Sequence, residues 1–269
     1  MVVSGYSHFR SALRYGLAAI TAWCITLSPV QAQEQSYVPV IAAASDLQFV
    51  LEEIATAFAA ETGQRVRLSL GSTGNFARQI REGAPFDIFM AADEQFVLDL
   101  HADGFTQDTG TLYGLGRIVL MAPHGALAVD PALDGLREAL AQGQITRFAI
   151  ANPEHAPYGL RAREALVTAG LWDQVRPHLV LGANVSQAAA FAMSGNAEGG
   201  IIALSLALAP QLDGRGDFAL IPEQWHSPLR QSMVLLPGAG PVAEAFYDYL
   251  QQPAARATFA RFGFTLPQE

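Results

Sequence analysis

Apolar positions along the chain follow two alternating patterns, one typical of strands and one typical of helices. After an apolar stretch at 37–44, apolar side chains recur at i, i+3, i+4, i+7 and i+11, the spacing of one helix face: Leu47, Val50, Leu51, Ile54 and Phe58. Gly63 is expected to end this helix. The residues at 65–70 then alternate between apolar and polar, which predicts a strand.

The same alternation continues to the end of the chain. Further strands are predicted at 86–91, 117–122, 148–151, 178–181, 200–203 and 231–236. Further helices are predicted at 75–82, 93–102, 133–142, 160–169, 185–193, 241–250 and 253–262. Repeated strand–helix units on this scale predict an α/β fold with parallel sheets covered by helices on both faces.

The first 32 residues have the organisation of a secretory signal peptide. Arg10 and Arg14 precede an uncharged, largely apolar stretch at 15–27, and small residues follow up to Ala32. The stretch is too short for a transmembrane helix, and a buried helix is disfavoured because the segment carries no acidic residue. We therefore expect a signal peptide at 1–32, cleavage near Ala32 and a soluble product in the periplasm.

The composition supports a folded protein and removes several function classes. The chain has 269 residues, of which 51% are hydrophobic and 15% charged, so it can bury a core and is not disordered. The formal net charge is −9, and all 16 basic residues are arginine. An acidic chain without lysine is a poor partner for nucleic acid and has no lysine for a P-loop or a Schiff base. The one cysteine, Cys24, excludes disulfide frameworks and thiolate metal sites.

The motifs of common enzyme classes are missing from the sequence. It contains no G-x-S-x-G, H-E-x-x-H or Walker motif, and its histidines lack metal-ligand spacing. A G-x-G-x-x-A match at 238–243 leaves only 26 residues after it, too few for a dinucleotide-binding unit. We therefore expect neither an enzyme nor a cofactor. The alternative from a different class is an exported enzyme with Ser45 or Ser72 as nucleophile, which no histidine or acidic motif supports.

Four predicted helices begin with small residues that can donate or accept hydrogen bonds. These helix starts lie at 42–48, 71–75, 152–159 and 184–187. Each alone is more often a simple cap, as in the capping box formed by Ser45 and Gln48. Parallel sheets bring the following helix N-termini to one edge, where free N–H groups and the helix dipole favour an anion. The sequence therefore predicts an anion site at this edge.

Several of these stretches, taken in order, resemble the periplasmic molybdate-binding proteins of ABC importers. They are Ala42-Ala43-Ala44-Ser45, the segments at 71–80, 83–89 and 152–159, and the tail at 245–250. The resemblance covers the whole chain beyond the signal peptide. It implies two α/β lobes of the type II periplasmic-binding-protein fold, each a mostly parallel sheet flanked by helices, with the ligand cleft between them. Lobe 1 would comprise 36–120 plus 235–269, and lobe 2 would comprise 121–234.

The resemblance also implies a function and a set of ligand-binding residues. A monomer would bind molybdate or tungstate in the periplasm and deliver it to the membrane permease of an ABC importer. The hydroxyls of Ser45 and Thr73 and the backbone N–H groups of Tyr158 and Val185 would hold the molybdenum only as its oxyanion. Some members add a tyrosine hydroxyl at the position of Ala203, which has none, so we expect the Tyr158 hydroxyl to replace it.

The chemistry of a tetrahedral dianion agrees with such a site. Molybdate and tungstate are fully ionised at neutral pH, so a site of N–H and O–H donors without a carboxylate satisfies them and leaves the proton of hydrogen phosphate without an acceptor. Arg78 and Arg161 lie about a turn inside their helices and are expected to face solvent. Sulfate, ferric ion and a small organic anion remain the alternative ligands, because this fold class serves many solutes.

Overall fold

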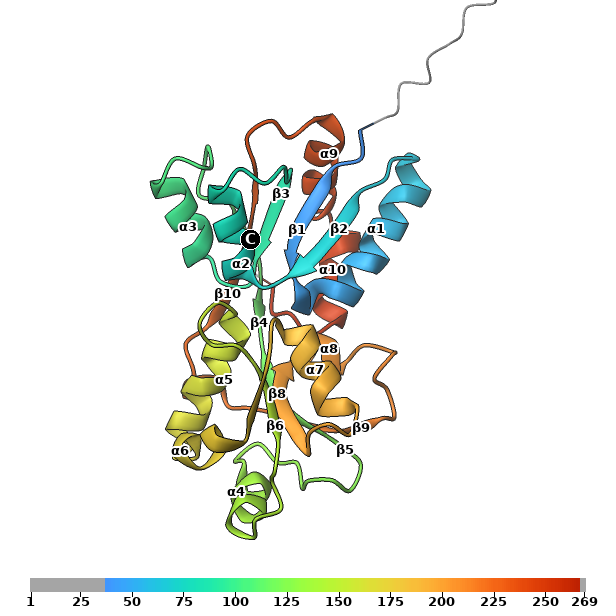
Figure 1. Ribbon diagram of the computed structural model, residues 1–269. Coiled ribbons are helices and arrows are strands. Elements are labelled where there is room, and N and C mark those ends of the chain that lie inside the picture. Colours follow the sequence, from blue (N-terminus) through green and yellow to red (C-terminus); the bar gives the residue numbers. More distant parts are fainter. Residues whose placement is uncertain (1–36, 267–269) are drawn as a thin grey trace, which may run out of the picture. The chain divides into compact units, whose positions relative to one another are not determined.

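The computed structural model describes residues 37–266, so the predicted signal peptide at 1–32 lies outside the described residues. Within them, ten strands form two five-stranded sheets (Figure 1). The first sheet has the order β2-β1-β3-β10-β4, built from β1 (Val40–Ala44), β2 (Arg67–Gly71), β3 (Ile88–Ala91), β4 (Thr111–Gly116) and β10 (Leu229–Leu235). The second has the order β7-β6-β8-β5-β9, built from β5 (Ile118–Pro123), β6 (Phe148–Ala151), β7 (Leu179–Gly182), β8 (Gly199–Ala203) and β9 (Gly216–Leu220).

In each sheet one strand is antiparallel to the other four. Strand β1 is parallel to β2 and β3, whereas β10 is antiparallel to β3 and β4. Likewise β6 is parallel to β7 and β8, whereas β5 is antiparallel to β8 and β9. The prediction of an α/β fold with mostly parallel sheets is therefore confirmed. The parallel strands end at one edge of each sheet, which is where ligands bind in such folds.

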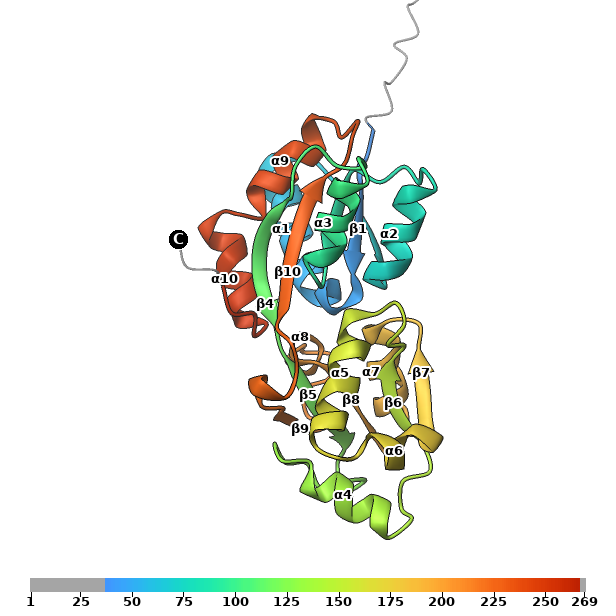
Figure 2. The ribbon, with the colours of Figure 1, turned by 90° about the vertical axis from the view of Figure 1, so that its left-hand side faces the viewer.

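Helices cover both faces of the first sheet (Figure 2). One face packs against α1 (Gln48–Thr62), α9 (Pro241–Tyr249) and α10 (Pro253–Arg261) through Ile41, Ala43 and Met90. The other face packs against α2 (Thr73–Arg81) and α3 (Gln95–Ala102) through Ala42 and Phe89. Because neighbouring side chains of a strand point to opposite faces, a continuously apolar strand such as β1 can serve both layers.

The second sheet has its own core and its own helices. These are α4 (Asp134–Ala141), α5 (Pro157–Thr168), α6 (Trp172–Val175), α7 (Val185–Met193) and α8 (Leu204–Ala207). The short 3-10 helices are η1 (Ser45–Leu47), η2 (Arg176–His178) and η3 (Glu223–Trp225). Strands β5, β6 and β8 are buried along almost their whole length, and α5 and α7 pack on them. None of the helices within residues 37–266 is long and apolar enough to cross a membrane.

The chain passes between the two sheets at two places. Only Arg117 separates β4 of the first sheet from β5 of the second, and the residues at 221–228 lead from β9 back to β10. The limits that we assigned to the two lobes remain a prediction. These two connections place the segments that follow β1, β2 and β3 close to those that follow β6 and β7, as the hydrogen bonds below show.

Candidate functional site

A small cavity is enclosed by segments that follow strands of both sheets. It has an empty volume of about 180 Å³ and is lined by Ala44, Ser45, Asp46, Gly71, Ser72, Thr73, Ala92, Ala156, Pro157, Tyr158 and Val185. A cavity of this size has room for a compact ligand only. All four predicted ligand-binding residues, Ser45, Thr73, Tyr158 and Val185, therefore line one cavity that suits a compact ligand.

The two predicted hydroxyls are buried and oriented by backbone N–H groups. The Ser45 Oγ accepts a hydrogen bond from the Ser186 N–H at 3.2 Å, and the Thr73 Oγ1 accepts one from the Ala92 N–H at 3.0 Å. A hydroxyl has one proton to donate in addition to its acceptor sites. Within residues 37–266 neither hydroxyl donates that proton to the protein. Both protons are therefore available to an acceptor in the cavity.

The two predicted backbone donors lie in the first turns of two helices. Tyr158 follows Pro157, the first residue of α5, and Val185 is the first residue of α7. The first N–H groups of a helix have no partner inside it. Neither N–H finds a hydrogen-bond partner elsewhere in the described part of the chain. The positive ends of two helix dipoles add to the preference of these donors for negative charge.

Ser72 and His155 form a contact beside the same cavity. The Ser72 Oγ lies 2.9 Å from the His155 Nδ1 and also caps α2 by accepting from the Asn75 N–H. The Gly74 N–H donates to the His155 carbonyl at 2.9 Å, and a Cβ on Gly74 would come within 2.7 Å of that oxygen, so the close approach requires glycine. The fold thus brings Ser72 into contact with a histidine that lies 83 residues away in the sequence, a contact that no local motif indicates. No third group orients this histidine within the described residues, as a catalytic triad would require.

Asp46 is a residue of the cavity that our sequence analysis missed. It is 1% exposed, and its Oδ2 accepts hydrogen bonds from the Tyr158 hydroxyl at 3.0 Å and the Gln231 Nε2 at 2.9 Å. Its Oδ1 is buried and has no hydrogen-bond partner among residues 37–266. Burial raises the pKa of Asp46 to about 6. The expectation of a site without a carboxylate is therefore wrong. An acidic residue in the first turn is ordinary in a helix, and nothing local in the sequence indicates this burial.

The Tyr158 hydroxyl does not have the role that we predicted for it. It gives its only proton to Asp46, and the Gln231 Nε2 lies 2.9 Å from its oxygen. The pKa of Tyr158 is raised well above its usual value, first by burial and then by the charge of Asp46. While it makes this hydrogen bond, the hydroxyl has no proton left to replace the donor absent at Ala203, which is buried at the end of β8. The backbone N–H of Tyr158 remains free for a ligand.

One of the two arginines near these helix starts is also placed differently from our expectation. Arg161 is 7% exposed rather than facing solvent, and it pairs with Asp93 at 2.6 Å and Glu164 at 2.9 Å. The pair with Asp93 connects α5 to the segment after β3. Arg78 is exposed as predicted and lies 3.9 Å from Glu82. Periodicity alone does not distinguish a solvent-facing arginine from one that meets a distant acid.

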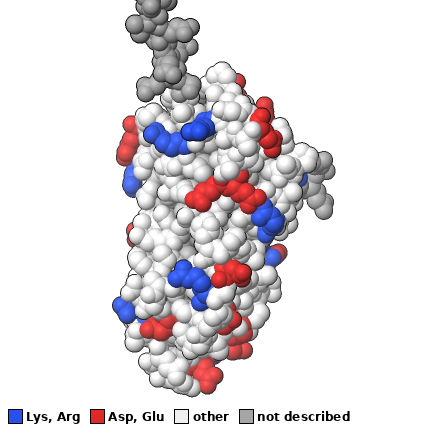
Figure 3. Space-filling model, turned by 90° about the vertical axis from the view of Figure 1, so that its right-hand side faces the viewer, with Lys and Arg blue, Asp and Glu red and all other residues white. Residues whose placement is uncertain are grey.

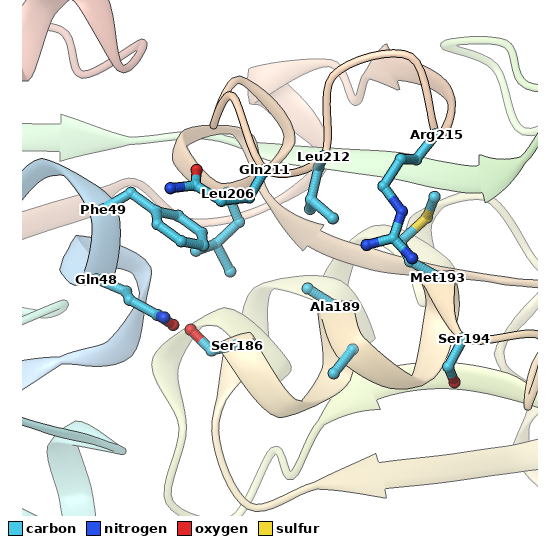
Figure 4. A pocket seen from close by; sticks show the side chains of 11 residues that line it. Gln48, Phe49, Ser186, Ala189, Met193, Ser194, Leu206, Gln211, Leu212 and Arg215 are labelled. Carbon is cyan, nitrogen blue, oxygen red and sulfur yellow. The ribbon is translucent and has the colours of Figure 1, made fainter.

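A second cavity, of about 820 Å³, opens between α1, α7 and α8 (Figure 4). Phe49, Leu206 and Leu212 line it together with the exposed Arg215, and it contains none of the four predicted residues. Among the described residues, no group of three or more His, Cys, Asp or Glu side chains could hold a metal ion. On the face seen in Figure 3, acidic and basic side chains are interspersed between wide uncharged areas. The donors described above therefore distinguish the small cavity from this second one.

Comparisons with known proteins agree with this architecture. The family model for bacterial extracellular solute-binding proteins matches residues 39–265. The molybdate-binding protein ModA of Azotobacter vinelandii is 34% identical over 229 residues, 84% of this chain and 89% of the relative. ModA of Escherichia coli K12 is 34% identical over 236 residues, 87% of this chain and 90% of the relative.

A solved structure gives the same result. The periplasmic molybdate-binding protein of Azotobacter vinelandii matches with a TM-score of 0.78 and 30% identity, covering 86% of this chain and 100% of that one. Sequence and structure therefore point to one group of proteins over nearly all the described residues. The chain belongs to the family of bacterial extracellular solute-binding proteins that includes ModA.

Proposed function

We propose that this protein binds molybdate, or the similar tungstate, in the periplasm and delivers it to the membrane permease of an ABC importer. It would act as a monomer, without a cofactor and without catalysis. The observation that carries the proposal is the convergence of four unused donors on one small cavity: the hydroxyl protons of Ser45 and Thr73 and the backbone N–H groups of Tyr158 and Val185.

The donor set matches the chemistry of the oxyanion. A tetrahedral dianion only accepts hydrogen bonds, and hydrogen bonds to a charged group contribute roughly 1.5–3 kcal/mol each. The small volume disfavours the larger organic anions, and sulfate remains the closest alternative because it has the same charge and shape. Hydrogen phosphate is not excluded by the donors alone, since Asp46 provides an acceptor for its proton.

The direct test is calorimetry and thermal unfolding of the chain from residue 33 onward with molybdate, tungstate, sulfate and phosphate. A ligand at about 100 times its dissociation constant stabilises the folded state by about 2.7 kcal/mol. We expect this stabilisation with molybdate, and the values for sulfate and phosphate measure how far the site discriminates among tetrahedral oxyanions. Ser45→Ala should weaken binding, whereas Ser194→Ala, a serine of the second cavity, should not. An unchanged melting temperature with saturating molybdate contradicts the proposal.

A serine-dependent enzyme is the alternative that one observation favours, the contact between Ser72 and His155. Incubation with activated esters followed by mass spectrometry separates the two functions. A binding protein remains unmodified, because no catalytic triad activates its serine hydroxyls. Acylation of Ser45 or Ser72 would favour the enzyme.

Export is tested by the N-terminus of the mature protein. We expect material from the periplasm to begin near Gln33 and to sediment as a monomer. A retained Met1, or a lipid on Cys24, would contradict the proposed signal peptide.

A further inference from the structure

The buried carboxyl group of Asp46 shares the small cavity with the four proposed ligand donors. Its two oxygens have different surroundings. Oδ2 accepts from the Tyr158 hydroxyl and from the Gln231 Nε2, whereas Oδ1 is buried and has no partner in the described part of the chain. A buried acceptor without a partner costs free energy, and a native protein usually retains one for a reason. We propose that Asp46 takes up a proton on Oδ1 when the oxyanion binds, so that the dianion meets a neutral carboxyl group.

The proton belongs on Oδ1 because both partners of Oδ2 are donors. The Tyr113 hydroxyl donates to the Gln231 Oε1 at 2.6 Å, which orients the Gln231 amide so that its Nε2 faces Asp46. The Tyr158 hydroxyl donates to the same Oδ2. Oδ2 therefore stays an acceptor in both protonation states. Protonated Oδ1 gains a donor, which suits an oxyanion that can only accept.

Within the described residues, the groups around Asp46 supply no positive charge to balance an ionised carboxylate. Tyr158 of α5, Tyr113 of β4 and Gln231 of β10 form the buried network, and Ser205 of α8 donates to the Asp46 backbone carbonyl. Burial raises the pKa of Asp46, and only hydrogen bonds lower it; no charged side chain contributes. A dianion in the same cavity repels an ionised carboxylate strongly in this low-dielectric setting. Protonation removes the repulsion and adds a donor.

The sign of the pH dependence follows from this linkage. Asp46 has a pKa of about 6 in the free protein, and a bound dianion must raise it. Between these two pKa values, binding takes up a proton, so affinity falls by up to tenfold for each unit of rising pH. Below about pH 6, Asp46 is already protonated and contributes no further change. The inference rests on the proposed function, since it requires a dianionic ligand.

Calorimetric titration with molybdate tests this between about pH 6 and about pH 8.5, in paired buffers of different ionisation enthalpy. We expect the unaltered protein to take up about half a proton per molybdate at about pH 6 and close to one proton at higher pH, and to lose affinity by up to tenfold per pH unit. Asp46→Asn places an amide N–H where the neutral carboxyl group has its O–H. This variant should bind without proton uptake, with little pH dependence, and more tightly than the unaltered protein at the alkaline end.

Two matched variants address the other titratable groups. His155→Asn removes the histidine that contacts Ser72 beside the cavity, and Asp87→Asn alters a buried aspartate outside the cavity lining. Both should retain the pH slope of the unaltered protein, whatever their affinity. Loss of the slope in His155→Asn with its retention in Asp46→Asn would assign the proton to the histidine and overturn the inference.

The outcomes also separate this inference from the proposed function. Molybdate binding without proton uptake and without a pH slope would overturn the role of Asp46 and leave the function intact. No binding of molybdate at any pH would overturn both. The proton count of the unaltered protein decides the question even if Asp46→Asn does not fold.

Discussion

Replacing Thr73 by valine removes one hydroxyl that has two separate roles. Its oxygen accepts from the N–H of Ala92, and its proton is free to bind the oxyanion. Loss of one hydrogen bond to a charged ligand costs roughly 1.5–3 kcal/mol, which weakens affinity about 10- to 150-fold. Ala92 is 1% exposed, so its N–H is left unsatisfied, and the unfolding free energy falls by about 1–3 kcal/mol. A loss of this size lowers the melting temperature by about 2–4 °C per kcal/mol.

The two effects are measured independently. Calorimetry with molybdate at about pH 6, where Asp46 contributes least, gives the change in affinity, and thermal unfolding of the free protein gives the change in stability. Thr73→Ser keeps the hydroxyl and is the matched control. If Thr73→Val and Thr73→Ser bind molybdate equally well, the hydroxyl does not contact the ligand. If Thr73→Val is as stable as the unaltered protein, the hydrogen bond from Ala92 contributes nothing.

Three further predictions concern the buried polar groups. Arg161→Met leaves the half-buried Asp93 unpaired and should lower the unfolding free energy by about 3 kcal/mol in chemical denaturation; adding Asp93→Asn should recover part of this loss. The folded-state pKa of Asp46, about 6 against an ordinary 3.8, means that its stabilising contribution is present below about pH 4 and is lost as pH rises through 6. The unfolding free energy of the unaltered protein should therefore fall, relative to that of Asp46→Asn, by up to about 3 kcal/mol from pH 4 to pH 7. Chemical denaturation of both proteins at the two pH values measures this difference. Tyr158→Phe should change molybdate affinity at about pH 6 far less than Thr73→Val, because its hydroxyl serves Asp46 and its backbone N–H is retained. If Tyr158→Phe and Thr73→Val lose the same affinity for molybdate, the Tyr158 hydroxyl binds the ligand after all.

The elements that the sequence predicted correctly are those whose burial repeats along the chain. Strands β1, β3 and β6 are buried at every position, and their continuous apolar stretches indicate this burial in the sequence. Two strands were not predicted. The sequence of β4 contains Gly114 and Gly116, which weaken a strand pattern. Strand β9 is an edge strand that exposes Phe218 and Leu220, so its alternation of polar and apolar positions carries little information.

The α/β fold class and the small hydrogen-bonding residues at the helix starts follow from the sequence alone. Caps and helix N-termini involve neighbours in the chain, so the stretches that contain Ser45 and Thr73 stand out as sequence patterns. The state of Asp46 depends on the tertiary structure, because its partners Tyr158 and Gln231 lie 112 and 185 residues away. The same holds for Arg161, which meets Asp93 68 residues away. Burial and pairing of a charge depend on what the fold brings to it, and no local pattern carries that information.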